Sequence, residues 1–274
     1  MKLIGSLSAA AFLFVVVAAG AQPALRGDAT RSRSAEPVRQ QPDVTVRFVK
    51  NPAPVPSLTV RDLEGRSITS ASWRGKVTLV NFWATWCGPC RAEIPALIAL
   101  QAKYRDHLQI VGVSVDEAPP DVVKRFVEVN HINYPVVMLT SELRAAFPGV
   151  FALPTTFVLD AQVRAVQRHV GLLNPIVYEQ EVQVLAGLLK ARVEEVEDTG
   201  QVLLVNAAQA TSIPGVSLDG LTRAQKRTAL ERLNHDKCTC GCGLTLAQCR
   251  INDPGCDVSL PLARKLVEQI RAAR

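Results

Sequence analysis

The sequence predicts an α/β fold, in which helices flank a mixed central sheet, followed by a small cysteine-rich helical unit. Three observations support this prediction. Strand-like and helix-like apolar patterns alternate over residues 52–192. Five of the seven cysteines fall in residues 238–256, and none lies in residues 91–237. With 48% hydrophobic and 20% charged residues among 274, the chain can bury a core, which excludes disorder throughout.

The first 21 residues have the pattern of a signal peptide. Lys2 precedes an apolar run that ends in Ala19-Gly20-Ala21, the small residues after which such peptides are cleaved. We therefore expect an exported, periplasmic protein, in a compartment where disulfides persist. If cleavage does not occur, the same segment would anchor the chain in the membrane. Residues 22–51, with several arginines and prolines, are expected to form a flexible spacer.

The predicted α/β domain, residues 52–192, begins with a hairpin around the turn Asp62–Gly65. Val77–Phe82 is a short apolar run typical of a buried parallel strand. A helix is expected from Pro89 to Tyr104, because its apolar residues recur at helical spacing. The remaining expected elements are a strand Leu108–Val115, a helix opened by Pro119 and Pro120, an edge segment Tyr134–Leu139, a helix Ser141–Phe147, a hairpin of Thr155–Leu159 with Ala165–Val170, and a final helix Ile176–Leu189.

A second, smaller unit is expected at the C-terminal end. Residues 193–220 are mixed in character and predict a linker, with a short strand at Val202–Val205. Residues 221–274 contain two helical patterns around the cysteine cluster. These are Leu221–Leu233, with Thr222 as the N-cap, and Pro261–Ala273.

The charge pattern excludes some functions. Lysine and arginine number 31 against 25 acidic residues, giving a net charge of +6. The basic residues form no block of the kind that follows phosphates, so nucleic-acid binding is not expected. His107, His131 and His169 are each isolated in the sequence and are expected on the surface or in packing rather than as metal ligands.

Cys87 and Cys90 are two residues apart, where the buried strand gives way to a helix. Such a pair can close a small disulfide ring, and free N–H groups at the helix N-terminus stabilise a thiolate at Cys87. Pro89 suits the first helical turn because it has no N–H to leave unpaired. A zinc half-site would need a second ligand pair, and an inert disulfide in so small a loop adds little stability. The pattern therefore favours thiol–disulfide exchange, which requires no cofactor.

The segment Val80–Arg91, VNFWATWCGPCR, resembles the thioredoxin superfamily, and within it the exported TlpA/ResA-like branch. The resemblance covers residues 55–190 and implies a thioredoxin fold with an N-terminal hairpin extension. It also implies that Cys87 is the nucleophile and Cys90 the resolving thiol. The implied substrate-binding residues are Trp86, Gly88, Pro89, Pro154 and Thr155.

Two further positions carry over from this family. Leu153-Pro154-Thr155-Thr156 resembles its cis-proline loop, which lies beside the cysteines. Glu93 matches an acid associated there with proton handling and substrate recognition, although a carboxylate favoured by the helix dipole is the alternative. Asn81 stands where cytoplasmic thioredoxins carry a buried aspartate. Because an amide cannot take up a proton, Glu93 or water must do so.

The implied activity is the reduction of disulfides in periplasmic client proteins. Gly-Pro between the cysteines is typical of thioredoxin, with a potential of about −270 mV against about −120 mV for the oxidant DsbA. The family implies a membrane electron donor of the DsbD or CcdA type, and apocytochrome c or metal-site thiols as substrates. A thiol peroxidase is a weaker alternative, because it would need a peroxidatic cysteine in a different loop.

The C-terminal cysteines follow the pattern C-x-C-x-C-x6-C-x6-C. They are Cys238, Cys240, Cys242, Cys249 and Cys256. A unit of this size needs staples because its apolar core is small. Disulfides, a zinc or copper site formed by these cysteines, and a redox relay to the other pair all remain open. A metal site would give a second function, metal handling or docking, in which the thioredoxin-like domain maintains these or partner thiols.

Overall fold

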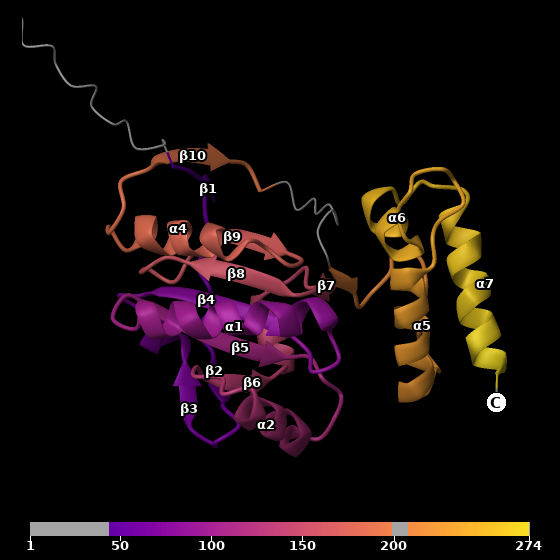
Figure 1. The fold of residues 1–274 in the computed structure, drawn as a ribbon, viewed down its shortest axis with the longest axis horizontal. Helices are drawn as coiled ribbons and strands as arrows, with labels where there is room; N and C mark the ends of the chain where they lie inside the picture. Colours follow the sequence, from indigo (N-terminus) through magenta and orange to yellow (C-terminus); the bar gives the residue numbers. More distant parts are fainter. Residues whose placement is uncertain (1–43, 199–207, 274) are drawn as a thin grey trace, which may run out of the picture. The chain divides into compact units, whose positions relative to one another are not determined.

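The computed structural model describes residues 44–198 and 208–273 (Figure 1). The predicted signal peptide, most of the predicted spacer and the expected strand at Val202–Val205 lie outside these residues. Within the described part of the chain, no helix is long and apolar enough to cross a membrane.

A five-stranded mixed sheet forms the centre of the first domain, as predicted. Its order is β6 (Val136–Met138), β5 (Leu108–Ser114), β4 (Val77–Trp83), β8 (Thr155–Leu159) and β9 (Ala165–Val170). The strands β4, β5 and β6 are parallel, whereas β8 and β9 run antiparallel to their neighbours. All seven residues of β4 are buried, which explains why its sequence is almost continuously apolar.

Helices and a hairpin surround this sheet. They are β2 (Thr59–Arg61), β3 (Ser67–Thr69), η1 (Ser70–Trp73), α1 (Gly88–Lys103), α2 (Pro120–Val129), α3 (Ser141–Ala146) and α4 (Pro175–Leu185). In α1, Ile94, Leu97 and Leu100 are buried at helical spacing, and the helix contacts both β5 and α4. The predicted fold class, a thioredoxin-like α/β domain with a hairpin extension, is confirmed.

One strand pair contradicts the expected spacer and linker. Residues 45–49 form β1 (Thr45–Val49), which pairs in parallel with β10 (Arg192–Val196). The expectation of a flexible spacer is therefore wrong for the last residues of that segment. Val46 and Phe48 alternate with exposed residues and are buried, a strand pattern masked by the surrounding arginines. The partner strand is remote in sequence, so no local signal indicated the pairing.

The C-terminal unit has three helices that lie side by side, α5 (Arg223–His235), α6 (Leu246–Asn252) and α7 (Ser259–Ala272) (Figure 1). Two of them were predicted, and α6 is additional because its seven residues are too few for a periodic pattern. Thr222 caps α5 as expected, in a capping box with Gln225. A separate apolar core lies between the helices, and β11 (Gln209–Ala210) pairs with β7 (Ala152–Leu153).

Candidate active site

Cys87 and Cys90 form a disulfide with an S–S distance of 2.02 Å at the start of α1. Cys87 is the N-cap of the helix, and its Sγ accepts a hydrogen bond from the Cys90 N–H at 3.2 Å. Both cysteines are buried, with Cys87 0% and Cys90 1% exposed. In this oxidised state, Trp86, Gly88 and Pro89 supply the accessible surface of the motif.

Asp116 holds the loop that precedes the cysteines, a role that the sequence reasoning missed. Its carboxylate accepts hydrogen bonds from the Thr85 N–H at 2.9 Å and the Thr85 hydroxyl at 2.6 Å. The Ser114 hydroxyl donates to the same carboxylate at 2.8 Å. Asp116 follows β5, and the carboxyl ends of β4 and β5 meet at one edge of the sheet because the strands are parallel. The sequence could therefore have indicated that Asp116 lies beside the loop before Cys87, because each follows one of two neighbouring parallel strands.

Glu93 is buried in the interior, with only 3% of its surface exposed. Its Oε2 accepts a hydrogen bond from Asn81 Nδ2 at 3.0 Å, and its Oε1 accepts one from the Tyr178 hydroxyl at 2.9 Å. Burial raises the pKa of Glu93 to about 7, against the lowering effect of these two donors. The carboxyl can therefore exist in both protonation states near neutral pH.

Two further residues complete a buried polar network around Glu93. Thr156 Oγ1 accepts from Asn81 Nδ2 at 2.9 Å and lies 3.1 Å from the Tyr178 hydroxyl. Thr156 is directly opposite Asn81 in the pairing of β8 with β4. Tyr178 comes from α4, and burial raises its pKa well above its ordinary value, so the phenol stays protonated and donates. The sequence gave Thr156 only as part of the cis-proline motif and did not single out Tyr178.

His169 lies next to this network. Its Nε2 is 2.9 Å from Glu181 Oε2, and its ring meets the Tyr178 ring edge-on with centroids 5.4 Å apart. His169 therefore packs against Tyr178 and also has a polar partner in Glu181. His107 and His131 are exposed.

The Leu153–Pro154 peptide bond is cis, as predicted. Thr155 pairs with Phe82 near the end of β4, so the cis-proline loop lies at the same end of the sheet as the strand that leads to Cys87. The Thr155 side chain is buried and donates to the Ala152 carbonyl at 2.6 Å. Pro154 is buried as well, and the backbone of Ala152 and Leu153 is already paired with β11, so this loop presents little accessible surface in the oxidised state.

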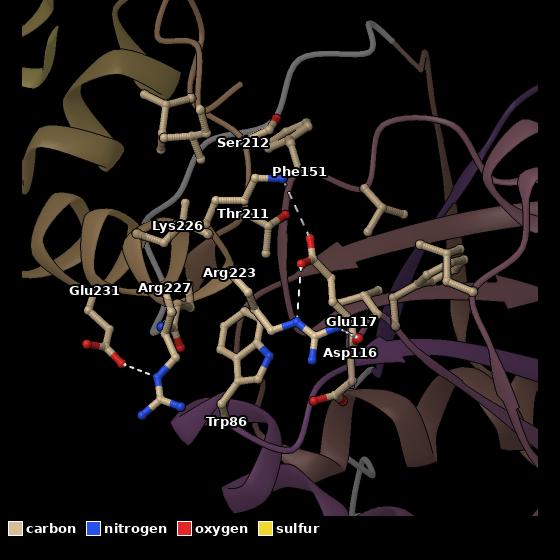
Figure 2. Close-up of a pocket in the computed structure, with 18 of the residues that line it drawn as sticks. Trp86, Asp116, Glu117, Phe151, Thr211, Ser212, Arg223, Lys226, Arg227 and Glu231 are labelled. Carbon is tan, nitrogen blue, oxygen red and sulfur yellow. Dashed lines mark hydrogen bonds and ion pairs between the residues drawn. The ribbon is translucent and has the colours of Figure 1, made fainter. Parts of the chain in front are cut away.

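Trp86 lines a pocket with a volume of about 1490 Å³. Figure 2 shows Trp86 and Phe151 among its lining residues, with charged side chains from α5 across the opening. Arg223 and Lys226 of α5 lie 3.8 Å and 4.0 Å from the carboxylate of Glu117. The pocket thus combines an aromatic side next to the cysteines with a charged side.

The five C-terminal cysteines do not all come together. The Sγ atoms of Cys238, Cys240, Cys249 and Cys256 form one group, whereas Cys242 is outside it and exposed. For Cys242 the expectation of a metal ligand stays a prediction, since its thiol is hydrogen-bonded to that of Cys240. Cys242 lies in a tight turn between two glycines, and the spacing of the cysteines in the sequence does not show where such a turn places a side chain.

Fold and site together define a thioredoxin-fold protein with a redox-active dithiol. The AhpC/TSA family model matches residues 50–167. The chain is 32% identical over 131 residues to the thioredoxin-like protein YneN of Bacillus subtilis, covering 47% of this chain and 76% of YneN. It is 34% identical over 137 residues to the thiol-disulfide oxidoreductase ResA of Bacillus anthracis, covering 49% of this chain and 74% of ResA. The chain belongs to the ResA-like thiol–disulfide oxidoreductases of the thioredoxin superfamily.

A solved structure resembles the same half of the chain. It is a thiol:disulfide interchange protein of the thioredoxin family from Chlorobium tepidum, 35% identical, with a TM-score of 0.48. The match covers 50% of this chain and 98% of that one. The cysteine-rich C-terminal unit lies outside the residues matched by the family model.

Proposed function

We propose that this oxidoreductase is exported and reduces disulfides in client proteins outside the cytoplasm. The observation that carries the proposal is the Cys87–Cys90 pair at the N-terminus of α1, with the buried Glu93 one turn further along the helix. The signal-like residues 1–21 support export. Gly-Pro between the cysteines supports a reducing rather than an oxidising role.

The reaction begins from the reduced dithiol. The Cys87 thiolate attacks one sulfur of the client disulfide, whose S–S bond breaks as a mixed disulfide forms. The leaving client thiolate takes up a proton. Cys90 then loses its proton and attacks the Cys87 sulfur, which releases the second client thiol. The client gains two electrons and two protons, and the protein is left as the Cys87–Cys90 disulfide.

Glu93 supplies the proton acceptor for Cys90 in this scheme. Asn81 cannot accept a proton, but its amide donates to Glu93 and fixes the carboxyl in place. Tyr178 does the same from α4. With a pKa of about 7, Glu93 takes up a proton as Cys90 becomes a thiolate and can return it to solvent afterwards.

Clients would dock on the surface around the cysteines. Trp86, Gly88 and Pro89 form the accessible part of this surface, whereas Pro154 and Thr155, which the family resemblance implies, are buried. The pocket beside Trp86 has room for the client residues that flank the disulfide. We propose apocytochrome c or metal-site thiols as clients.

Each turnover consumes the dithiol, so the protein needs an electron supply. A membrane donor of the DsbD or CcdA type would reduce the Cys87–Cys90 disulfide by the same exchange chemistry. This requirement follows from an oxidising compartment, which offers no dithiol pool of sufficiently low potential.

Trapping of mixed disulfides tests the proposal. The full chain carrying Cys90→Ser should accumulate a covalent adduct with a disulfide-containing apocytochrome c peptide, whereas Cys87→Ser should form none. Cys242→Ser is the matched control, since it removes an exposed thiol outside the dithiol, and should turn over normally. Full peptide reduction by Cys87→Ser would contradict the proposal.

Metal binding by the C-terminal unit is a second candidate function, with zinc or copper as the ion. The observation that favours it is the gathering of four cysteine sulfurs within 4.8 Å of one another. Under this function the thioredoxin-like domain would keep these or partner thiols reduced. Metal content of the purified full chain tests it, because disulfide staples would leave the chain metal-free.

A further inference from the structure

The four gathered sulfurs have separations typical of ligands around one ion. The distance is 3.3 Å between Cys238 and Cys240, and 3.9 Å between Cys240 and Cys249. A disulfide needs about 2.05 Å. Four thiolates, each about 2.3 Å from one zinc ion, stand about 3.8 Å apart at the corners of a tetrahedron. The geometry therefore fits shared coordination better than two disulfides.

The ligands come from three segments of the C-terminal unit. Cys238 and Cys240 lie in the loop between α5 and α6. Cys249 lies within α6, and Cys256 lies in the loop before α7. Cys238 and Cys249 are buried in the small core that the three helices share. An ion at this point would join both loops to the middle helix, where the apolar core alone is small.

The loop after α5 is shaped to present two of the sulfurs. Gly241 and Gly243 have φ values of +89° and +71°, which favour glycine and reverse the chain. The reversal brings the Cys238 N–H to the Leu244 carbonyl at 2.9 Å. Cys242, between the two glycines, is exposed at the turn. Cys242 is not among the four sulfurs that all lie within 4.8 Å of one another, although its thiol is hydrogen-bonded to that of Cys240.

A buried positive charge lies next to Cys249 in the chain. Arg250 is 3% exposed, and its guanidinium donates to the carbonyls of Pro214 at 3.2 Å and Pro254 at 2.7 Å. These partners are neutral, and Arg250 forms no ion pair within the described residues. Zinc with four thiolates carries two net negative charges. A buried guanidinium nearby offsets part of that charge.

We propose that Cys238, Cys240, Cys249 and Cys256 bind one Zn²⁺ as a tetrahedral structural site from which Cys242 is excluded. This inference rests on the metal-binding function proposed above and deepens it. Binding converts four thiols to thiolates and releases four protons to solvent, with no change in oxidation state. The coordinated sulfurs then no longer exchange with disulfides, so the site stays separate from the Cys87–Cys90 dithiol.

The ligand set favours zinc over the other candidates. A tetrahedral arrangement of four thiolates indicates zinc or iron–sulfur chemistry. Because the four sulfurs lie within 4.8 Å of one another, they enclose space for a single ion. Iron would colour the purified protein, whereas a zinc site is colourless, so an absorption spectrum separates the two.

Two neighbouring serine variants of the full chain test the ligand set. Cys240 and Cys242 are both exposed and lie in the same loop, so Cys240→Ser and Cys242→Ser form a matched pair. After purification with zinc, we expect one zinc per chain in the wild type and in Cys242→Ser. Cys240→Ser removes a ligand and should bind zinc at least about 100-fold more weakly. Loss of a residue that only hydrogen-bonds to a ligand already weakens metal binding by about 10- to 100-fold.

Thiol labelling of the wild type gives a second readout that does not depend on how the variants fold. With the Cys87–Cys90 disulfide intact, alkylation of the zinc-loaded chain should modify Cys242 alone, and chelation by EDTA should expose all five C-terminal thiols. A metal-free chain with C-terminal disulfides would overturn both metal binding and this inference. Three outcomes would overturn the assigned site but not metal binding. They are a zinc loss in Cys242→Ser equal to that in Cys240→Ser, labelling of a cysteine other than Cys242, and bound iron in place of zinc.

Discussion

Asn81 Nδ2 donates a hydrogen bond to Glu93 Oε2 at 3.0 Å inside the thioredoxin-like domain. The sequence indicated that Asn81 stands where cytoplasmic thioredoxins carry a buried aspartate, and that Glu93 or water must take up the proton. The structure joins the two residues directly, with Tyr178 completing the contacts of the carboxyl. Asn81 therefore helps to fix the position of the Glu93 carboxyl.

Glu93→Gln should stabilise the oxidised protein above neutral pH. Burial raises the folded-state pKa of Glu93 to about 7 from 4.5, so the folded protein holds a proton that the unfolded chain loses. The wild type should therefore lose stability as pH rises from 4.5 to about 7, by up to about 3 kcal/mol. Urea denaturation at pH 4.5 and pH 8 measures the difference.

The matched control is Glu128→Gln, which changes an exposed carboxylate on α2. It should leave the pH dependence of the wild type unchanged. Equal pH dependence in the wild type and in Glu93→Gln would show that Glu93 has an ordinary pKa in the folded protein.

Tyr178→Phe should move the pH profile of disulfide reduction upward. Loss of the phenol removes a donor to the Glu93 carboxylate, and this raises the pKa of Glu93 further. The reaction needs the carboxylate as base, so half-maximal rate should shift by about one pH unit. Insulin reduction at a series of pH values measures it. Tyr104→Phe, which removes a donor to Glu179 instead, should not shift the profile.

Asp116→Ala should destabilise the domain by about 2–4 kcal/mol, because three hydrogen bonds from Thr85 and Ser114 to one carboxylate are lost. Guanidinium denaturation of the oxidised protein measures the loss. Asp106→Ala removes an exposed carboxylate and should cost little. A loss below about 0.5 kcal/mol in Asp116→Ala, within the range of ordinary surface changes, would show that the loop does not depend on this carboxylate.

Local patterns account for most of what the sequence could predict. The strand before Cys87 and the helix after it depend on a few adjacent residues and were predictable from them, whereas the cis peptide at Pro154 was predicted from the family resemblance of Leu153–Thr156. Tyr178 was not, because it reaches Glu93 from a helix 85 residues further along the chain. The spacing of the C-terminal cysteines likewise gave no sign that four of them, without Cys242, lie within 4.8 Å of one another.

The pairing of β1 with β10 shows the same limit in the fold. Each strand is five residues long, with one charged residue in β1 and three in β10, and the partners are 147 residues apart. Only the alternation of Val46 and Phe48 marked β1 as a strand, and the arginines around it indicated a spacer instead. Contacts between remote segments determine such elements, and a reading of local periodicity does not detect them.

The redox potential of the Cys87–Cys90 pair tests the central claim most directly. The full chain is equilibrated in thiol buffers of defined potential and alkylated, and the state of each cysteine is read by peptide mass. A disulfide reductase predicts a value near or below about −250 mV, close to that of thioredoxin. A value near about −120 mV, that of a disulfide donor, would contradict the reducing function proposed here.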